Sequence, residues 1–150
     1  MKTVILYLIL PLFIFGCSGK SGDYYTFLGK DASEFQKIYG EAHENNGQLL
    51  IEVSDVDRLL LEVDNNNKIT YIGKYYLGYK TLAAAKSDMG KVGQELITYG
   101  YVKARTLVDT LDGIEVEFDV FKKGEITVVS TILNPANTNQ EGITVVVQTL

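Results

Sequence analysis

Short apolar segments separated by turn residues are the feature that most limits the folds open to this chain. The segments are rich in Val, Ile and Leu and have the length of β-strands. They lie at 48–53, 58–63, 68–72, 101–109, 113–121, 125–133 and 142–150. Asp, Asn and Gly tolerate the backbone of tight turns, so the polar segments 64–67 and 122–124 predict β-hairpins. The pattern therefore predicts an antiparallel β-meander.

Two further segments have the spacing of helices. The first runs from Ser33, a candidate N-cap, to Gly40, a candidate stop, and is short and amphipathic. The second follows Thr81, another candidate cap, and its apolar face consists of Leu82, Ala85, Met89, Val92 and Leu96. Gly90 and Gly93 each cost about 1 kcal/mol inside a helix. Both one helix over 81–99 and two short helices divided near Gly90 therefore remain open.

The order of these segments recurs within the chain. When residues 47–73 are shifted by 57 positions onto 104–130, the two hairpin turns coincide. The identical pairs are Leu50/Leu107, Asp55/Asp112, Val63/Val120, Ile69/Ile126 and Thr70/Thr127. The recurrence predicts a single α+β domain over 24–150, made of two tandem helix-meander repeats at about 24–73 and 74–150.

The segment GKDASEFQKIYG at 29–40 resembles the helical signature of small bacterial lipoproteins of the SmpA/BamE type and of the two-repeat β-lactamase-inhibitor-like fold. In those families a glycine opens the segment, an acid or amide precedes a hydrophobic pair, and a glycine ends it before strands follow. Residues 90–100 repeat the pattern loosely. The resemblance implies a non-catalytic, protein-binding module of the cell envelope. The alternative fold is a cystatin-like unit, with one helix at 81–99 followed by a four-stranded sheet.

The N-terminus has the layout of an export signal. A basic start at 1–3 precedes an apolar run at 4–15, and small residues close the segment. The run is about 18 Å long as a helix, too short to cross a bilayer permanently, so we expect removal of residues 1–16. Residues 14–17 resemble a bacterial lipobox, which implies that Cys17 becomes lipidated with acyl chains of the palmitate type. Residues 17–23 would then form a flexible tether.

The residue after the lipidated cysteine gives an expectation about location. By resemblance to enterobacterial lipoproteins, an Asp there favours retention in the inner membrane, whereas this chain has Ser18. We therefore expect a protein anchored in the outer membrane and facing the periplasm.

Composition excludes several classes of function. The net charge of -5 opposes nucleic-acid binding, which requires clustered Lys and Arg. A single Cys and a single His allow neither a disulfide framework nor a Cys/His zinc site. Residues 90–93 lack both the preceding strand and the ending of a phosphate-binding loop. We therefore expect no nucleic-acid partner, no nucleotide and no cofactor.

The polar residues do not form a recognisable catalytic group. His43 is expected to be solvated in a polar loop at 41–47. Glu115, Glu117 and Asp119 alternate with apolar residues, which places the acids on one face of a strand without indicating a cleft. The segment 64–68 lacks the glycine and distal glutamate of a calcium loop. These features favour a protein that is not an enzyme.

The most suggestive group for binding is aromatic. Tyr71, Tyr75, Tyr76 and Tyr79 lie within the segment 71–80, and tyrosine is favoured at binding surfaces. The functional interpretation is a contact surface on a connector between the repeats, and the alternative is that alternate rings pack under the sheet or line its edge.

Two classes of function fit these features. The first is a lipid-anchored module that binds another envelope or secreted protein, for assembly or for inhibition and immunity. The alternative is a lipoprotein that binds a small ligand or glycan in a pocket between helix and sheet, lined by Tyr75, Tyr76 or Tyr79. Near the tether, the pair Tyr24 and Tyr25 is expected mainly to dock the N-terminus onto the domain.

Overall fold

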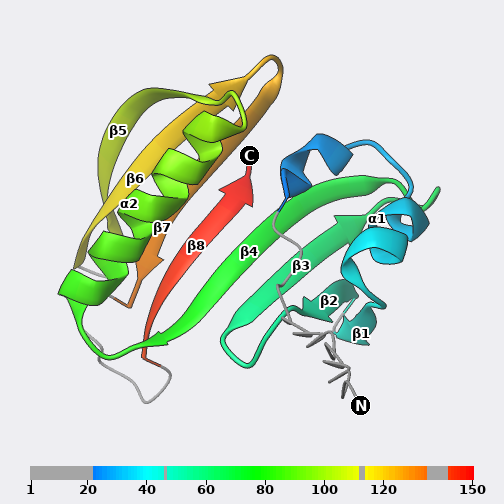
Figure 1. Cartoon of the computed structure of the whole chain (residues 1–150), viewed down its shortest axis with the longest axis horizontal. Coiled ribbons are helices and arrows are strands. Elements are labelled where there is room, and N and C mark those ends of the chain that lie inside the picture. Colours follow the sequence, from blue (N-terminus) through cyan, green and yellow to red (C-terminus); the bar gives the residue numbers. More distant parts are fainter. Residues whose placement is uncertain (1–21, 46, 112–113, 135–141) are drawn as a thin grey trace, which may run out of the picture.

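The computed structural model describes residues 22–45, 47–111, 114–134 and 142–150, which form one antiparallel sheet of eight strands with its helices on one face (Figure 1). The strands are β1 (His43–Asn45), β2 (Gln48–Glu52), β3 (Asp57–Val63), β4 (Ile69–Tyr79), β5 (Val102–Leu111), β6 (Ile114–Lys123), β7 (Ile126–Leu133) and β8 (Ile143–Thr149). The helices are the 3₁₀-helix η1 (Tyr24–Phe27), α1 (Ala32–Tyr39) and α2 (Leu82–Thr98). The strand order is β1-β2-β3-β4-β8-β7-β6-β5.

The predicted α+β class is confirmed, and each of the seven segments predicted as strands overlaps a strand, β2 to β8. The last strand, β8, pairs with both β4 and β7 and so joins the strands that follow α1 to those that follow α2. The four strands after α2 therefore belong to a sheet of eight. The cystatin-like alternative, a single helix on a four-stranded sheet, does not describe the chain.

Helix α1 is capped by a different residue from the one predicted. Asp31 is the N-cap, and its Oδ1 accepts a hydrogen bond from the Ser33 backbone N–H at 3.0 Å. The same oxygen accepts from Asn67 Nδ2 at 2.9 Å, which ties the helix to the β3–β4 turn. The hydrogen bonds from Ser33 hold the pKa of Asp31 below its usual value. Gly40, with a φ of 119°, ends the helix as expected.

Helix α2 is continuous despite its two glycines. Thr81 caps it, as predicted, with its side chain accepting from the Ala84 backbone N–H at 3.2 Å. Gly93 is buried, and a Cβ at this position would lie 3.2 Å from Phe121 Cζ on β6. Gly90 is exposed, and a Cβ added there would have no neighbour within 4 Å. Packing against Phe121 therefore explains Gly93, while Gly90 carries only a helix-propensity cost.

This difference predicts that alanine substitutions at Gly90 and Gly93 change the stability of the protein by different amounts. We expect Gly90→Ala to stabilise the protein by about 0.5–1 kcal/mol, because alanine is the better helix former and meets no neighbour. Gly93→Ala should lose that gain, since its methyl group would press on Phe121. Thermal unfolding followed by circular dichroism measures both midpoints. Equal stabilisation by the two substitutions would contradict the close approach of α2 to β6.

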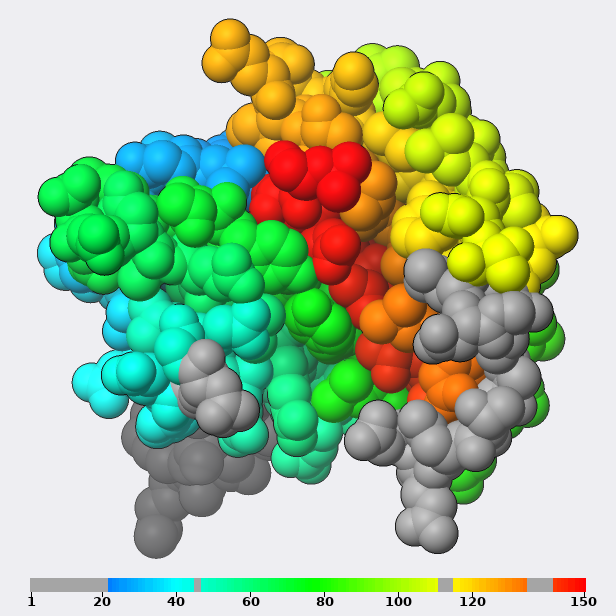
Figure 2. Space-filling view, turned by 180° about the vertical axis from the view of Figure 1, so that it is seen from behind, coloured from blue at the N-terminus to red at the C-terminus, as the bar shows by residue number. Residues whose placement is uncertain are grey.

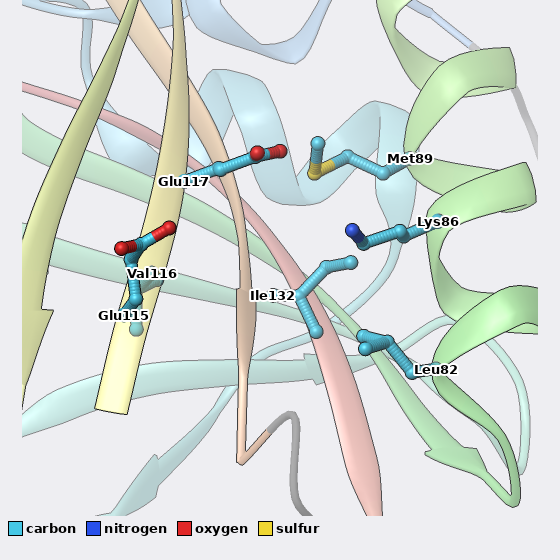
Figure 3. A pocket seen from close by; sticks show the side chains of 7 residues that line it. All are labelled: Leu82, Lys86, Met89, Glu115, Val116, Glu117 and Ile132. Carbon is cyan, nitrogen blue, oxygen red and sulfur yellow. The ribbon is translucent and has the colours of Figure 1, made fainter. Parts of the chain in front are cut away.

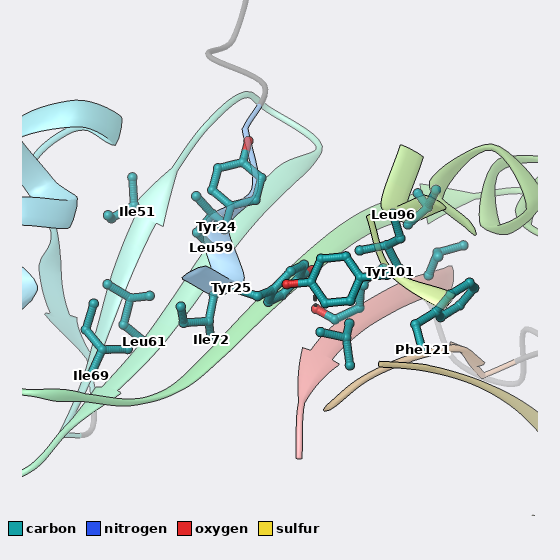
Figure 4. Packing of buried hydrophobic residues seen from close by; sticks show 14 of the residues in the cluster. Tyr24, Tyr25, Ile51, Leu59, Leu61, Ile69, Ile72, Leu96, Tyr101 and Phe121 are labelled. Carbon is teal, nitrogen blue, oxygen red and sulfur yellow. Dashed lines mark hydrogen bonds between the residues drawn. The ribbon is translucent and has the colours of Figure 1, made fainter. Parts of the chain in front are cut away.

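The core contains a cluster of three tyrosines, Tyr24, Tyr25 and Tyr101 (Figure 4). The first two belong to η1, which packs between the half of the sheet formed by β1 to β4 and the half formed by β5 to β8. The Tyr25 hydroxyl donates to the Val147 carbonyl of β8 at 3.1 Å, and its ring meets Tyr101 edge-on at 6.4 Å. The Tyr101 hydroxyl in turn donates to Asp23 Oδ1 at 3.0 Å, and Lys123 Nζ lies 2.8 Å from Asp23 Oδ2. Tyr24 and Tyr25 are therefore buried and hold η1, at the start of the described chain, against the sheet.

The proposed signal segment and Cys17 lie outside the described residues. Within the part of the chain that the structure does describe, no helix has the length and apolar character needed to cross a membrane.

Candidate functional site

The sequence predicted that the tyrosine-rich segment is a connector between repeats. This prediction is wrong, because the segment forms most of the long strand β4. This strand lies inside the sheet and pairs with β3 on one side and β8 on the other. Successive side chains of a strand point to opposite faces. The tyrosines are therefore divided between the face that carries the helices and the opposite face, which we call the open face.

Tyr71 and Tyr75 lie on the open face. Their hydroxyls are 3.1 Å apart, and the Tyr71 hydroxyl also donates to Gln148 Oε1 of β8 at 2.8 Å. The two rings close over Gly73, where an added Cβ would lie 2.6 Å from the Tyr71 hydroxyl and 2.9 Å from Tyr75 Cε2. Burial raises the pKa of the Tyr71 phenol, which therefore stays protonated at neutral pH. This pair is consequently tied to the sheet by its own hydrogen bonds.

Tyr76 and Tyr79 face the helices. The Tyr79 hydroxyl donates to Asp88 Oδ2 of α2 at 2.9 Å, and the Lys74 ammonium lies 4.6 Å from the centre of the Tyr76 ring. Burial raises the pKa of both phenols, so both remain neutral donors. Because these two rings lie on the other side of the sheet from Tyr71 and Tyr75, the four predicted residues do not form one surface.

The space between helix and sheet beside Tyr76 is small. It has a volume of about 20 Å³ and is lined by the helix residues Val92, Glu95 and Leu96 in addition to tyrosines. That volume is close to the space needed by one water molecule. Neither Tyr75 nor Tyr79 lines it. The tyrosines therefore do not enclose a cavity of ligand size here.

A second hollow, of about 110 Å³, lies between α2 and β6 (Figure 3). Its lining residues are Leu82, Lys86, Met89, Glu115, Val116, Glu117 and Ile132. Glu117 points from β6 toward Met89. The third acid of this strand face, Asp119, is neutralised by Lys103, whose Nζ lies 2.6 Å from its Oδ1. The predicted alternation of acids and apolar residues is confirmed, and the acids are on the side that faces α2.

The other polar candidates have structural partners or open positions. His43 is exposed and begins strand β1, so the predicted polar loop is partly a strand that pairs with β2. Asp64 Oδ1 accepts from the backbone N–H groups of Asn66 at 2.8 Å and Lys68 at 2.9 Å, which confirms the hairpin turn. Among the described residues, no group of His, Cys, Asp and Glu is arranged to hold a metal ion.

The largest of these hollows was not predicted from the sequence. It has a volume of about 600 Å³ and lies on the open face, over strands β5 to β8. Its lining residues are Arg105, Leu107, Val108, Asp109, Phe118, Val120, Lys122, Thr127, Val129, Gln148 and Leu150. Figure 2 shows this side of the molecule, where β4, β8 and β7 run side by side with no helix over them.

The open face is apolar at its centre. Val120, Val129 and Val146 come from three neighbouring strands and are at most 4% exposed, although no described helix covers them. Phe118 is half-buried beside them, and Leu107 at the outer strand is 41% exposed. Exposed apolar area with a polar border is typical of an interaction surface. The signal in the sequence was the alternation of Val116, Phe118 and Val120, which is equally typical of a strand packed against the core.

Comparison of the chain with protein-family models, with curated proteins and with solved structures finds no match.

Proposed function

We propose that this chain is a lipid-anchored, non-enzymatic protein of the cell envelope that binds another protein through the open face of its sheet. The observation that carries the proposal is the apolar hollow over β5 to β8, with Phe118 and the buried valines at its base. The partner would be an envelope protein that is assembled with it or a secreted protein that is inhibited by it.

The sizes of the hollows favour a protein partner over a small ligand. Sites for small molecules enclose about 300–1,000 Å³. The two spaces between α2 and the sheet, at about 20 Å³ and 110 Å³, fall below that range. The hollow of about 600 Å³ is large enough, but it lies on a sheet face that no described helix covers, and it includes exposed side chains such as Leu107 and Lys122. Such a surface suits side chains presented by a folded partner.

The charges at the hollow indicate what the partner presents. Lys122 is exposed on β6 directly opposite Thr127 of β7, and both line the hollow. Phe118 and Val120 lie on the same face of β6, which places apolar area next to the ammonium group. A partner that inserts an apolar side chain and places a carboxylate beside Lys122 would match both features.

The path of the chain supports an accessible open face. Gly22, the first described residue, lines the small space with Tyr25 and Leu96 on the side of the sheet that carries the helices. Asp23 is held there by Tyr101 and Lys123. The described chain therefore begins on the face of the sheet that carries the helices, opposite the hollow.

We further propose that the domain consists of two repeats. The shift of 57 residues places β2 on β5 and β3 on β6, and it aligns the start of β4 with the start of β7. Each set follows one helix, α1 or α2. Strand β8 has no counterpart in the first set, and it lies between β4 and β7. This correspondence of elements supports duplication of a helix-meander unit.

Affinity capture from detergent-solubilised envelopes tests the proposed function. The full chain should recover a partner in stoichiometric amount, and Thr127→Arg should reduce recovery at least about tenfold by filling the hollow, as expected for the centre of an interface. Thr98→Arg is the matched control, because Thr98 is exposed on α2 on the other side of the sheet. Recovery of the chain without a partner, or equal loss with both variants, would contradict the proposal.

A further inference from the structure

The outer strand β5 exposes a long unpaired edge. It contains 10 residues, pairs with β6 alone among the described strands, and is exposed at every position from 102 to 110. The opposite edge of the sheet, β1, has only 3 residues. An edge strand presents backbone N–H and C=O groups that can pair with another strand. The strand also exposes the apolar side chains Val102, Leu107 and Val108, which could pack against a second chain.

The side chains of β5 carry a self-complementary pattern. Arg105, Leu107 and Asp109 pair with Val120, Phe118 and Val116 of β6, which places all three on the open face. The register shift between Lys103 and Arg105 marks the start of this regular stretch. The described ion pairs of the molecule involve four lysines but neither Arg105 nor Asp109. A cation and an anion therefore flank one leucine symmetrically, and neither is in one of the described ion pairs, although Asp109 Oδ1 accepts a hydrogen bond from the Thr110 backbone N–H at 2.7 Å.

We propose that two copies of this chain associate through β5, antiparallel, about a twofold axis at Leu107. The axis is perpendicular to the sheet, so residues that face each other must lie on the same face in both copies. Centring on Leu107 places Arg105 of each copy opposite Asp109 of the second copy. Centring on Thr106 would place Arg105 opposite Leu107, and centring on Val108 would place Asp109 opposite Leu107. Only the first register pairs the opposite charges.

Pairing in this register joins two sheets of eight strands edge to edge. The open faces of both copies would lie on the same side, with the two Leu107 side chains in contact between the two hollows. One strand pair buries less than the roughly 800 Å² per partner of a standard interface. We therefore expect a dimer whose population rises with concentration. The inference concerns self-association and does not depend on the proposed partner.

Charge exchange within the pair tests the register. Sedimentation of the full chain in detergent should show a dimer that Arg105→Asp or Asp109→Arg weakens at least about tenfold, because each change opposes like charges at two places. The double variant R105D/D109R should dimerise again. An equimolar mixture of the two single variants should also form a heterodimer, since an Asp of one variant then faces an Arg of the other at both places. Arg58→Asp, on an exposed position of the interior strand β3, is the control and should leave the dimer unchanged.

Disulfide formation gives a second measurement of the same geometry. In a Cys17→Ser background, Leu107→Cys should cross-link the two copies under mild oxidation, because the residue would lie opposite itself. Val108→Cys should cross-link poorly, since it would lie opposite Thr106. A monomer at all accessible concentrations would overturn the proposal. A dimer whose population is unchanged by the charge exchanges would also overturn the proposal, because that result is expected when two chains merely share a detergent micelle. Both outcomes can be distinguished from failure of the proposed function, which is tested separately by affinity capture with Thr127→Arg.

Discussion

Tyr25→Ala is expected to lower the free energy of unfolding by about 3–5 kcal/mol, the cost typical of truncating a buried aromatic residue. The Tyr25 side chain is 4% exposed and packs against Tyr24 and Tyr101 at ring distances of 6.5 Å and 6.4 Å. It is the residue through which η1 fills the space between the two halves of the sheet. Its loss would leave a cavity at the centre of the core.

The conservative variant separates packing from hydrogen bonding. Tyr25→Phe keeps the ring but leaves the Val147 carbonyl without the donor that lies 3.1 Å away, so we expect a cost of only about 1 kcal/mol. Urea denaturation of both variants gives the two free energies. If Tyr25→Ala costs no more than Tyr25→Phe, the ring does not support the core as described.

The strands were predictable because local chemistry and tertiary packing agree. The β3–β4 turn is one example, since Asp64 accepts from backbone N–H groups of its own turn. Strand β1 was missed because His43, Glu44 and Asn45 are all polar. It forms by antiparallel pairing with β2 and buries neither His43 nor Glu44. A strand that forms through backbone pairing and buries neither side-chain face has no hydrophobic alternation by which the sequence could reveal it.

The start of β4 was predicted at 68–72, but its continuation to Tyr79 was missed for a different reason. Gly73 and Gly78 interrupt the segment, and glycine is unfavourable in a strand when judged locally. In the fold, Gly73 leaves the space over which the Tyr71 and Tyr75 rings meet. This is a tertiary requirement, and it is visible only when the neighbouring side chains are placed.

The position of the candidate site depends on which face of the sheet α2 covers, and the sequence pattern does not show this. Alternation in β6 showed that Val116, Phe118 and Val120 share one side and the acids the other. It did not show which side α2 covers. The helix lies on the side of Glu117 and Phe121, so Phe118 and Val120 line the hollow on the open face. Which face is covered is decided by how the chain crosses from β4 through α2 to β5.

Cys17→Ser is expected to abolish incorporation of labelled palmitate and to release the protein from washed membranes. A lipidated cysteine with two or more acyl chains gives stable attachment, because each buried methylene contributes about 0.8 kcal/mol. The described residues contain no helix that would replace it. Residues 4–15 of an uncleaved variant span about 18 Å, too short for a permanent anchor, so alkaline carbonate should extract that form.

Ser18→Ala is the matched control for this experiment, since it changes the neighbouring residue and leaves the thiol in place. We expect it to incorporate palmitate and sediment with membranes like the unchanged chain. The two predicted losses have different meanings. Unlabelled protein that still resists carbonate extraction after Cys17→Ser would show that another part of the molecule holds the membrane, and it would contradict the proposed lipid anchor. Loss of both label and attachment would instead make the tether at 17–23 the only link, with Asp23, fixed by Tyr101 and Lys123, as the point where the domain begins.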